Sequence, residues 1–200
     1  MKTRILLMAA LAALMCLATQ QTIQGGDKKK DEDPFAKMPK PGPEHKLLAQ
    51  LEGTWNAKVK SWFRPGEPKE SSGVMVRKMI MDGRYLHEEF KGEFLGMKFL
   101  GRGITGYDLN KKKYVMAWID NFGTGISTNQ GSYDKDSKTW TFKGQEDIPD
   151  MGKAKTRDVL KMVSADEQTF EMYRTPLESK EKGIPKEIKV MEITYTRKAK

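Results

Sequence analysis

Apolar and polar residues alternate in short runs along most of the chain after Gly53. Runs rich in Val, Ile, Thr and aromatic residues are separated by Gly, Asp and Asn, which is typical of strands joined by turns. The pattern predicts ten strands, at 54–63, 73–81, 84–94, 97–108, 113–120, 125–133, 139–145, 155–163, 168–174 and 188–197. Ten strands with short connections indicate an antiparallel up-and-down sheet.

A weak internal repeat supports hairpin connections between these strands. The segments 107–114 and 133–140 both read Tyr-Asp-x-(Asn/Asp)-x-Lys-x-aromatic. This pattern predicts a strand that ends in Tyr, a polar turn opened by an Asp side chain, and a new strand that begins on an aromatic residue. Asp82-Gly83 is a further hairpin signal. Because an open sheet would leave two unpaired edges, we expect the strands to close into a barrel.

One short helix is predicted ahead of the strands, over 44–51. Leu47, Leu48 and Leu51 lie on one face of this helix, and Gly53 ends it. We expect its apolar face to pack at one end of the barrel. The predicted fold class is therefore all-β, an antiparallel up-and-down barrel of about ten strands with a short N-terminal helix.

Residues 1–18 have the pattern of an export signal. Lys2 and Arg4 precede an uncharged, mostly apolar run that is too short to cross a bilayer comfortably. We expect cleavage after this run and export to the periplasm or the extracellular space. Residues 19–43 are rich in Lys, Asp, Gly and Pro and predict a flexible linker. Residues 44–200 then form the barrel domain.

Cys16 leaves one alternative open. Bacterial lipoproteins carry a cysteine just after the apolar run of the signal, and Cys16 would then bear a lipid anchor. Met15, however, is bulkier than the small residue that such a site prefers. Otherwise Cys16 is removed when the signal is cleaved, and the mature chain has no cysteine for a disulfide or a thiolate nucleophile. We expect no transmembrane span elsewhere.

The charge of the chain adds little to the prediction of its binding partners. It carries 36 Lys and Arg against 27 Asp and Glu, a formal net charge of +9. Loss of the signal removes Lys2 and Arg4 and leaves +7. The basic residues are spread thinly and do not alternate with aromatic residues, so nucleic-acid binding is not expected. Attraction to an anionic envelope surface remains an open alternative.

Four motifs carry a family resemblance: His45-x-x-Leu48-x-x-Leu51-x-Gly53-x-Trp55, Asp82-Gly83-Arg84-Tyr85-Leu86, Gly101-x-Gly103-x-x-Gly106-Tyr107-Asp108 and Trp118-x-Asp120. Together they resemble the domain-of-unknown-function 1579 family over about 44–197. Gly53-x-Trp55 alone resembles the wider calycin superfamily, which includes lipocalins, fatty-acid-binding proteins and nitrobindins. The resemblance implies a lipocalin-like barrel that is often exported and has no established activity.

The calycin resemblance also implies one structural contact. In calycins the Trp of the first strand commonly packs under an Arg from the last strand and closes the base of the barrel. Trp55 and Arg197 match those positions by type and place. A cation–π contact between them would contribute about 0.5–2 kcal/mol. The alternative is that Arg197 simply belongs to the basic C-terminal tail.

Motifs for catalysis, metals or cofactors are few. The chain has no G-x-S-x-G, P-loop or H-E-x-x-H motif, and His45 and His87 are too far apart to indicate a metal site. The glycines of 101–106 mimic a dinucleotide-binding motif, but no helix pattern follows them. Nitrobindins bind haem through a late histidine, whereas the last histidine here is His87. We therefore expect no metal and no cofactor.

Strand alternation and residue chemistry together suggest where a ligand would bind. In the fifth predicted strand, Tyr114, Met116, Trp118 and Asp120 share one face. A ligand-binding barrel needs an apolar interior with a few polar anchors. We expect the anchors to be Trp118, Asp120, Arg102, Glu88 and Arg174.

The sequence favours a binding protein over an enzyme. The leading prediction is an exported protein that holds a small apolar or amphipathic ligand in its barrel. One alternative is a barrel enzyme that acts on a small molecule through interior carboxylates such as Glu88 or Asp120. Another is an envelope protein that binds its partners through a basic surface.

Overall fold

The computed structural model describes residues 38–63, 66–148, 152–177 and 187–199. The predicted export signal, Cys16 and most of the predicted linker lie outside the described residues. Export, lipid attachment and the linker therefore stay predictions.

The described residues form one helix and ten strands. Their bounds are α1 (Pro43–Ala49), β1 (Gly53–Ser61), β2 (Lys69–Ile80), β3 (Tyr85–Phe94), β4 (Met97–Asp108), β5 (Lys113–Asp120), β6 (Ser127–Asp134), β7 (Thr139–Ile148), β8 (Gly152–Met162), β9 (Glu167–Pro176) and β10 (Ile188–Arg197).

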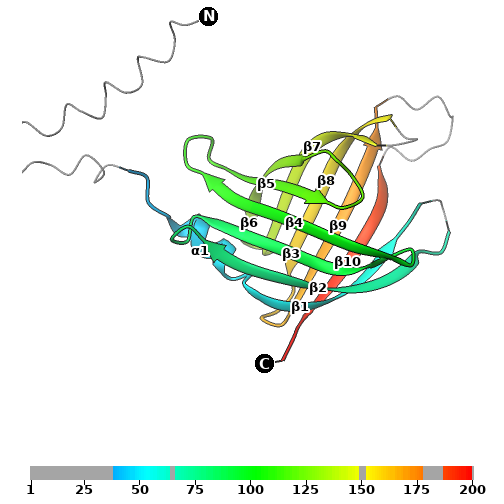
Figure 1. Cartoon of the computed structure of the whole chain (residues 1–200). Coiled ribbons are helices and arrows are strands. Elements are labelled where there is room, and N and C mark those ends of the chain that lie inside the picture. The colour runs from blue at the N-terminus through cyan, green and yellow to red at the C-terminus, as the bar shows by residue number, and fades with distance from the viewer. Residues whose placement is uncertain (1–37, 64–65, 149–151, 178–186, 200) are drawn as a thin grey trace, which may run out of the picture. The chain divides into compact units, whose positions relative to one another are not determined.

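The ten strands form a closed antiparallel barrel in which each strand pairs with its sequence neighbours and β10 pairs back to β1 (Figure 1). This confirms the predicted fold class. The largest boundary difference is at β2, which begins at Lys69 instead of residue 73. Lys69–Ser72 is polar, so alternation gives no signal there, but its backbone pairs with Lys58–Ser61 of β1.

The two ends of the barrel differ in their connections. At the end that α1 covers, all four connections have four residues: 81–84, 109–112, 135–138 and 163–166. At the opposite end, the connections are 62–68, 95–96, 121–126, 149–151 and 177–187. We call these the helix end and the open end.

The repeated sequence motif produces two matching turns at the helix end. Asp108 Oδ1 accepts the backbone N–H groups of Asn110 and Lys111 at 2.9 and 3.0 Å. Asp134 Oδ1 accepts the corresponding two N–H groups at 2.9 Å each. These hydrogen bonds lower the pKa of both carboxyl groups. The predicted polar turn opened by an Asp side chain is therefore present twice.

Side chains fill the barrel beneath α1. Leu48 and Leu51 are buried there with members of β3, β5, β7 and β8. The helix is also tied down by polar contacts: Tyr114 Oη donates to the carbonyl of Glu44 at 3.2 Å, and Gly42 N–H donates to His45 Nδ1 at 3.0 Å. The helix end is therefore closed by packed side chains.

Arg197 lies over the indole of Trp55, with Cζ 4.1 Å from the ring centroid. The same guanidinium donates to the carbonyl of Glu52 at 3.1 Å and to Asp166 Oδ1 at 3.0 Å. Gly53 makes room for it, because a Cβ there would lie 2.4 Å from Nη1 of Arg197. One side chain thus joins β10, the start of β1 and the β8–β9 turn.

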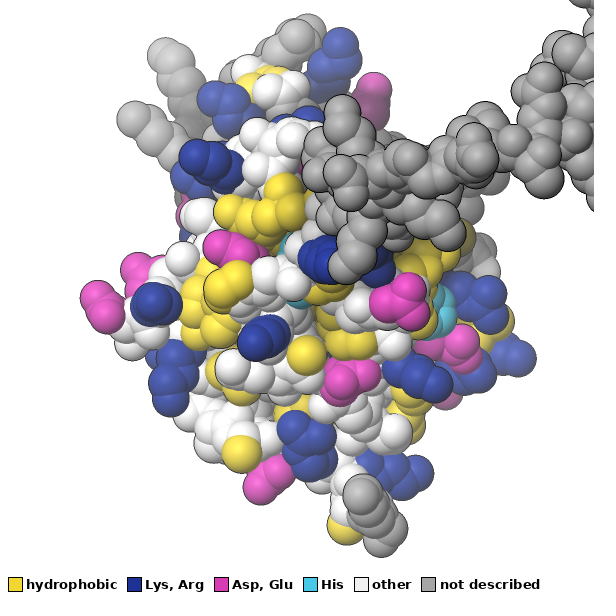
Figure 2. Space-filling model, turned by 90° about the vertical axis from the view of Figure 1, so that its left-hand side faces the viewer, with side chains coloured by type: hydrophobic (Ala, Val, Ile, Leu, Met, Phe, Trp, Pro, Cys, Tyr) yellow, Lys and Arg dark blue, Asp and Glu magenta, His cyan; other side chains and the backbone are white. Residues whose placement is uncertain are grey.

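Arg102 lies on the outside of the barrel, not in it. Phe99 and Thr105 of β4 line the interior, so strand alternation turns the side chain of Arg102 outward. Its side chain is 66% exposed and its Nη2 lies 3.6 Å from Glu89 Oε2. The expectation that Arg102 anchors a ligand is therefore corrected. On the face in Figure 2, basic and acidic side chains are interspersed in the same way.

We predict that Arg197→Ala lowers the free energy of unfolding by about 2 kcal/mol, because it removes a cation–π contact and charge-assisted hydrogen bonds together. Urea unfolding followed by tryptophan fluorescence measures the change. Arg102→Ala is the matched control and should cost about 0.5 kcal/mol or less. Equal losses in the two variants would contradict the role of Arg197 in closing the barrel.

His45 makes the helix end sensitive to pH. Burial lowers the pKa of His45, Glu44 opposes this shift and Arg84 adds to it. Because the folded pKa lies below the unfolded value of about 6.5, the unfolded chain binds a proton more readily. The contribution of His45 to stability is therefore complete above about pH 6.5 and is lost as the pH falls towards the folded pKa.

We predict that the wild type loses more stability than His45→Gln between about pH 7.5 and pH 5.5. Protonation would also remove the acceptor for the Gly42 N–H. Urea unfolding of both proteins at the two pH values measures this, and the carboxyl groups common to both cancel in the difference. The same loss in both proteins would show that His45 does not titrate with folding.

Candidate functional site

A cavity of about 350 Å³ lies inside the barrel between the packed helix end and the open end. All ten strands contribute to its wall. The wall is mainly aromatic and aliphatic, and it includes Met75, Phe90, Phe99, Met116, Trp118, Phe142, Phe170 and Ile193. Small-molecule sites typically occupy roughly 300–1,000 Å³ and are lined in this way. The cavity is therefore large enough for one small ligand.

Two glycines of β4 seat the indole of Trp118 in the wall. A Cβ at Gly101 would lie 2.1 Å from Trp118 Cζ2, and one at Gly103 would lie 2.9 Å from Trp118 Cε3. Both glycines pair directly across from β5, at Asp120 and Trp118. Gly101 and Gly103, which belong to the segment that mimics a dinucleotide motif, thus leave room for the Trp118 ring to pack against β4.

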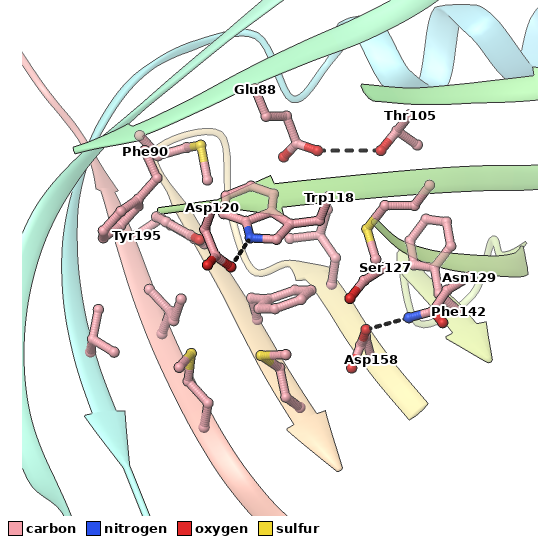
Figure 3. Close-up of a pocket in the computed structure, with 18 of the residues that line it drawn as sticks. Glu88, Phe90, Thr105, Trp118, Asp120, Ser127, Asn129, Phe142, Asp158 and Tyr195 are labelled. Atoms are coloured by element: carbon pink, nitrogen blue, oxygen red, sulfur yellow. Dashed lines mark hydrogen bonds between the residues drawn. The ribbon is translucent and has the colours of Figure 1, made fainter. Parts of the chain in front are cut away.

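Arg77 occupies one side of the interior. Its Nε donates to Glu88 Oε1 at 2.8 Å and its Nη1 donates to Gln168 Oε1 at 2.7 Å. The guanidinium also lies 4.6 Å from the ring centroid of Tyr195, whose pKa burial raises to about 12. Glu88 Oε2 accepts a hydrogen bond from Thr105 at 3.2 Å (Figure 3). This buried charge is fully paired.

Arg174 forms a second buried ion-pair network. Its Nη1 donates to Asp158 Oδ1 at 2.8 Å, and its Nε donates to Glu146. Asp158 Oδ2 accepts from Asn129 Nδ2 at 2.7 Å (Figure 3). Burial raises the pKa of Asp158, and the neighbouring Arg174 opposes that shift. Both oxygens of Asp158 are thus occupied by protein donors.

Asp120 lies at the end of β5, where the cavity meets the open end. Its Oδ2 accepts from the indole N–H of Trp118 at 3.1 Å (Figure 3). Its Oδ1 accepts from the backbone N–H of Phe122 at 2.9 Å. Both donors are neutral. The carboxylate is half-buried and has no ion-pair partner among the described residues.

Phenylalanine rings line the rim of the open end. Phe99 and Phe122 meet edge to face with centroids 5.2 Å apart, and Phe94 packs 5.7 Å from Phe122. Phe63 joins them at 5.5 Å from Phe94 and is 58% exposed. The rim therefore continues the apolar wall of the cavity outwards.

The structure brings four of the five expected ligand anchors to the cavity. Trp118, Asp120, Glu88 and Arg174 all line it, whereas Arg102 does not. The sequence analysis missed the other charged and amide residues of the wall, which are Arg77, Glu93, Asn129, Glu146 and Asp158. The inward position of Arg77 could have been predicted from the sequence, because Arg77 shares a strand face with Met75 and Met79.

The described residues show no feature of two other kinds of site. They contain no helix long and apolar enough to cross a membrane. They also hold no group of three or more His, Cys, Asp or Glu side chains placed to bind a metal ion.

A likeness to one solved structure supports the barrel fold. The S-type phycobiliprotein lyase CPES from Guillardia theta is similar with a TM-score of 0.54 and 7% sequence identity, over 78% of this chain and 93% of that one. A redesigned beta barrel matches with a TM-score of 0.39 and 14% identity, over 76% of this chain and 96% of that one. At these identities the likeness concerns the fold alone.

Sequence comparison identifies the family. No functionally curated protein matches the chain significantly. A family model described as protein of unknown function, DUF1579, matches residues 40–197. This confirms the resemblance carried by the four sequence motifs, and the chain belongs to the DUF1579 family.

Proposed function

We propose that the protein binds a small apolar or amphipathic molecule non-covalently inside its barrel. The observation that carries the proposal is the cavity of about 350 Å³, whose wall extends from Leu48 of α1 to Phe94 and Phe122 at the opposite end of the barrel. A barrel that served only as a rigid scaffold would have its interior filled by side chains, as it is beneath the helix. The likeness to the phycobiliprotein lyase concerns the fold, so the proposal depends on this chain's own cavity.

The wall of the cavity suits apolar ligands of more than one shape. Four methionines, Met75, Met116, Met172 and Met191, line it together with phenylalanines from β3, β4, β7 and β9. Methionine side chains adapt to irregular apolar shapes. The polar groups of the wall are few and mostly satisfied by one another, so burial of apolar surface supplies most of the affinity.

Catalysis by an interior carboxylate is the second candidate function. A raised pKa inside a cavity is typical of catalytic acids, and burial raises the pKa of Asp158. Against this, Arg174 and Asn129 donate to its two oxygens, which leaves Asp158 fixed in a structural network. Binding therefore remains the better-supported function.

We also propose that the protein is exported and acts outside the cytoplasm. The support is the signal pattern of residues 1–18, with Lys2 and Arg4 ahead of the apolar run. Lipid attachment at Cys16 is the minority alternative. Fractionation of cells that express the full chain, with mass measurement of the mature form, distinguishes cleavage after the apolar run from a lipid on Cys16.

We predict that the neutral fluorescent probe N-phenylnaphthylamine binds the barrel and that Met172→Trp weakens this binding by about tenfold or more. Met172 lies in the cavity wall, so a larger ring at that position occupies ligand space. Fluorescence titration measures the affinity, and native mass spectrometry gives the stoichiometry. One probe per chain is expected.

The matched control places the same ring outside the barrel. Ile119 lies on the outer face of β5 and is exposed, so Ile119→Trp should bind the probe as the wild type does. Thermal unfolding of both variants checks that each is folded. Equal affinity for the probe in Met172→Trp and Ile119→Trp would show that the probe binds elsewhere and would overturn the proposal.

A further inference from the structure

We propose that the ligand is a hydrophobic molecule with a cationic group, and that the cation lies beside Asp120 at the open end. This inference rests on the proposed binding function and adds to it the charge of the ligand and its direction in the barrel. The apolar part of the ligand points towards the helix end.

The charges around the cavity are the first support. Among the described residues, its wall includes five acidic side chains and two arginines but no lysine or histidine. The whole chain, in contrast, has a formal net charge of +9. The acidic excess of the cavity is therefore a local feature of the site and does not follow from composition.

Both arginines of the wall are already neutralised. Arg77 pairs with Glu88 at 2.8 Å, and Arg174 pairs with Asp158 at 2.8 Å as well as with Glu146. Breaking either pair would leave a buried charge without a partner, which is strongly unfavourable. Among the described residues of the wall, a carboxylate or phosphate ligand would thus find no unpaired arginine and would lie near acidic groups.

Asp120 differs from the other interior carboxylates. Glu88, Glu146 and Asp158 each contact an arginine. Among the described residues, Asp120 accepts only from the neutral N–H groups of Trp118 and Phe122. Glu93, the fifth acidic residue of the wall, is exposed at the end of β3. A carboxylate has about four acceptor positions, so two hydrogen bonds orient the group and leave capacity for a further donor. An ammonium group supplies both the donor and the opposite charge.

Aromatic rings beside Asp120 strengthen the preference for a cation. Trp118 donates its indole N–H to the carboxylate, and Phe122 donates its backbone N–H while its ring packs 5.2 Å from Phe99. The faces of aromatic rings attract cations, and ammonium ligands are recognised in this way. One carboxylate with three rings provides a binding position for an alkylammonium group.

The other end of the cavity suits a hydrocarbon chain. Leu86, Phe142 and Leu160 line it towards the helix end and belong to the core cluster that packs against α1. A ligand that placed its cation there would desolvate the charge without a partner. The cavity thus defines one orientation, with the apolar tail inside and the cation at the mouth.

Three ligands with the same tail test this proposal: decylamine, decanol and decanoate. Displacement of N-phenylnaphthylamine from the wild type at pH 7 and low salt gives their affinities, and calorimetry checks them directly. We expect decylamine to bind about tenfold more tightly than decanol, and decanoate to bind more weakly than decanol. Added salt should weaken the binding of decylamine and leave that of decanol nearly unchanged.

Asp120→Asn should abolish the preference for decylamine while decanol still binds, and Asp120→Glu should retain part of the preference. Asp136→Asn is the matched control. Asp136 lies in the exposed β6–β7 turn at the helix end, so this substitution changes the net charge equally and should leave all three affinities unchanged.

The outcomes separate this inference from the proposed function. If the probe and decanol bind but wild-type protein does not prefer the amine, the cationic ligand is ruled out and the binding function stands. If neither the probe nor any decyl compound binds, the proposed function itself fails. A preference for the amine that persists equally in Asp120→Asn would overturn the assigned seat of the cation.

Discussion

Closure of the sheet is the constraint on which the rest of the structure depends. Once β10 pairs with β1, no strand edge remains exposed, and the number of strands sets the width of the interior. Trp55 pairs directly with Arg197 across this seam, and the guanidinium covers the indole. The contact lies where the first and last strands meet, so it stabilises the pairing that brings the two ends of the domain together.

A ten-stranded barrel is too wide for its side chains to fill from end to end. At the helix end, α1 inserts Leu48 and Leu51 and completes the packing. Beyond that layer the interior contains two ion-pair networks, centred on Arg77 and Arg174, and the space that remains is the cavity. The same closure that protects the strand edges thus leaves a largely apolar cavity between the helix end and the open end.

Local patterns predicted most of the fold. The strands after β2 begin and end within a few residues of their predicted bounds, and the repeated Tyr-Asp motif correctly predicted two matching turns. These features depend on alternation and on hydrogen bonds between near neighbours, which a single sequence displays. The start of β2 was missed because Lys69–Ser72 is held by pairing with β1, a contact with no local signal.

The interior polar residues were harder to predict because their partners are distant in sequence. Arg77 meets Gln168, which lies 91 residues away, and Asp158 meets Asn129 across two intervening connections. Arg102 was predicted inside on its chemistry, although its strand alternates the other way. Residue type indicates what a side chain prefers, whereas strand alternation and closure decide which side of the sheet it occupies.

The charge of the barrel shows how the outside and the inside of one domain can differ. From a net charge of +9 alone, an anionic partner would be expected. Inside the barrel, each arginine is held by a carboxylate, and Asp120, which has no ion-pair partner among the described residues, lies among aromatic rings at the open end. Charges on the outer surface are screened from a ligand inside the cavity. The unpaired groups of the wall therefore determine which ligand charge is preferred, and the net charge of the chain does not determine it.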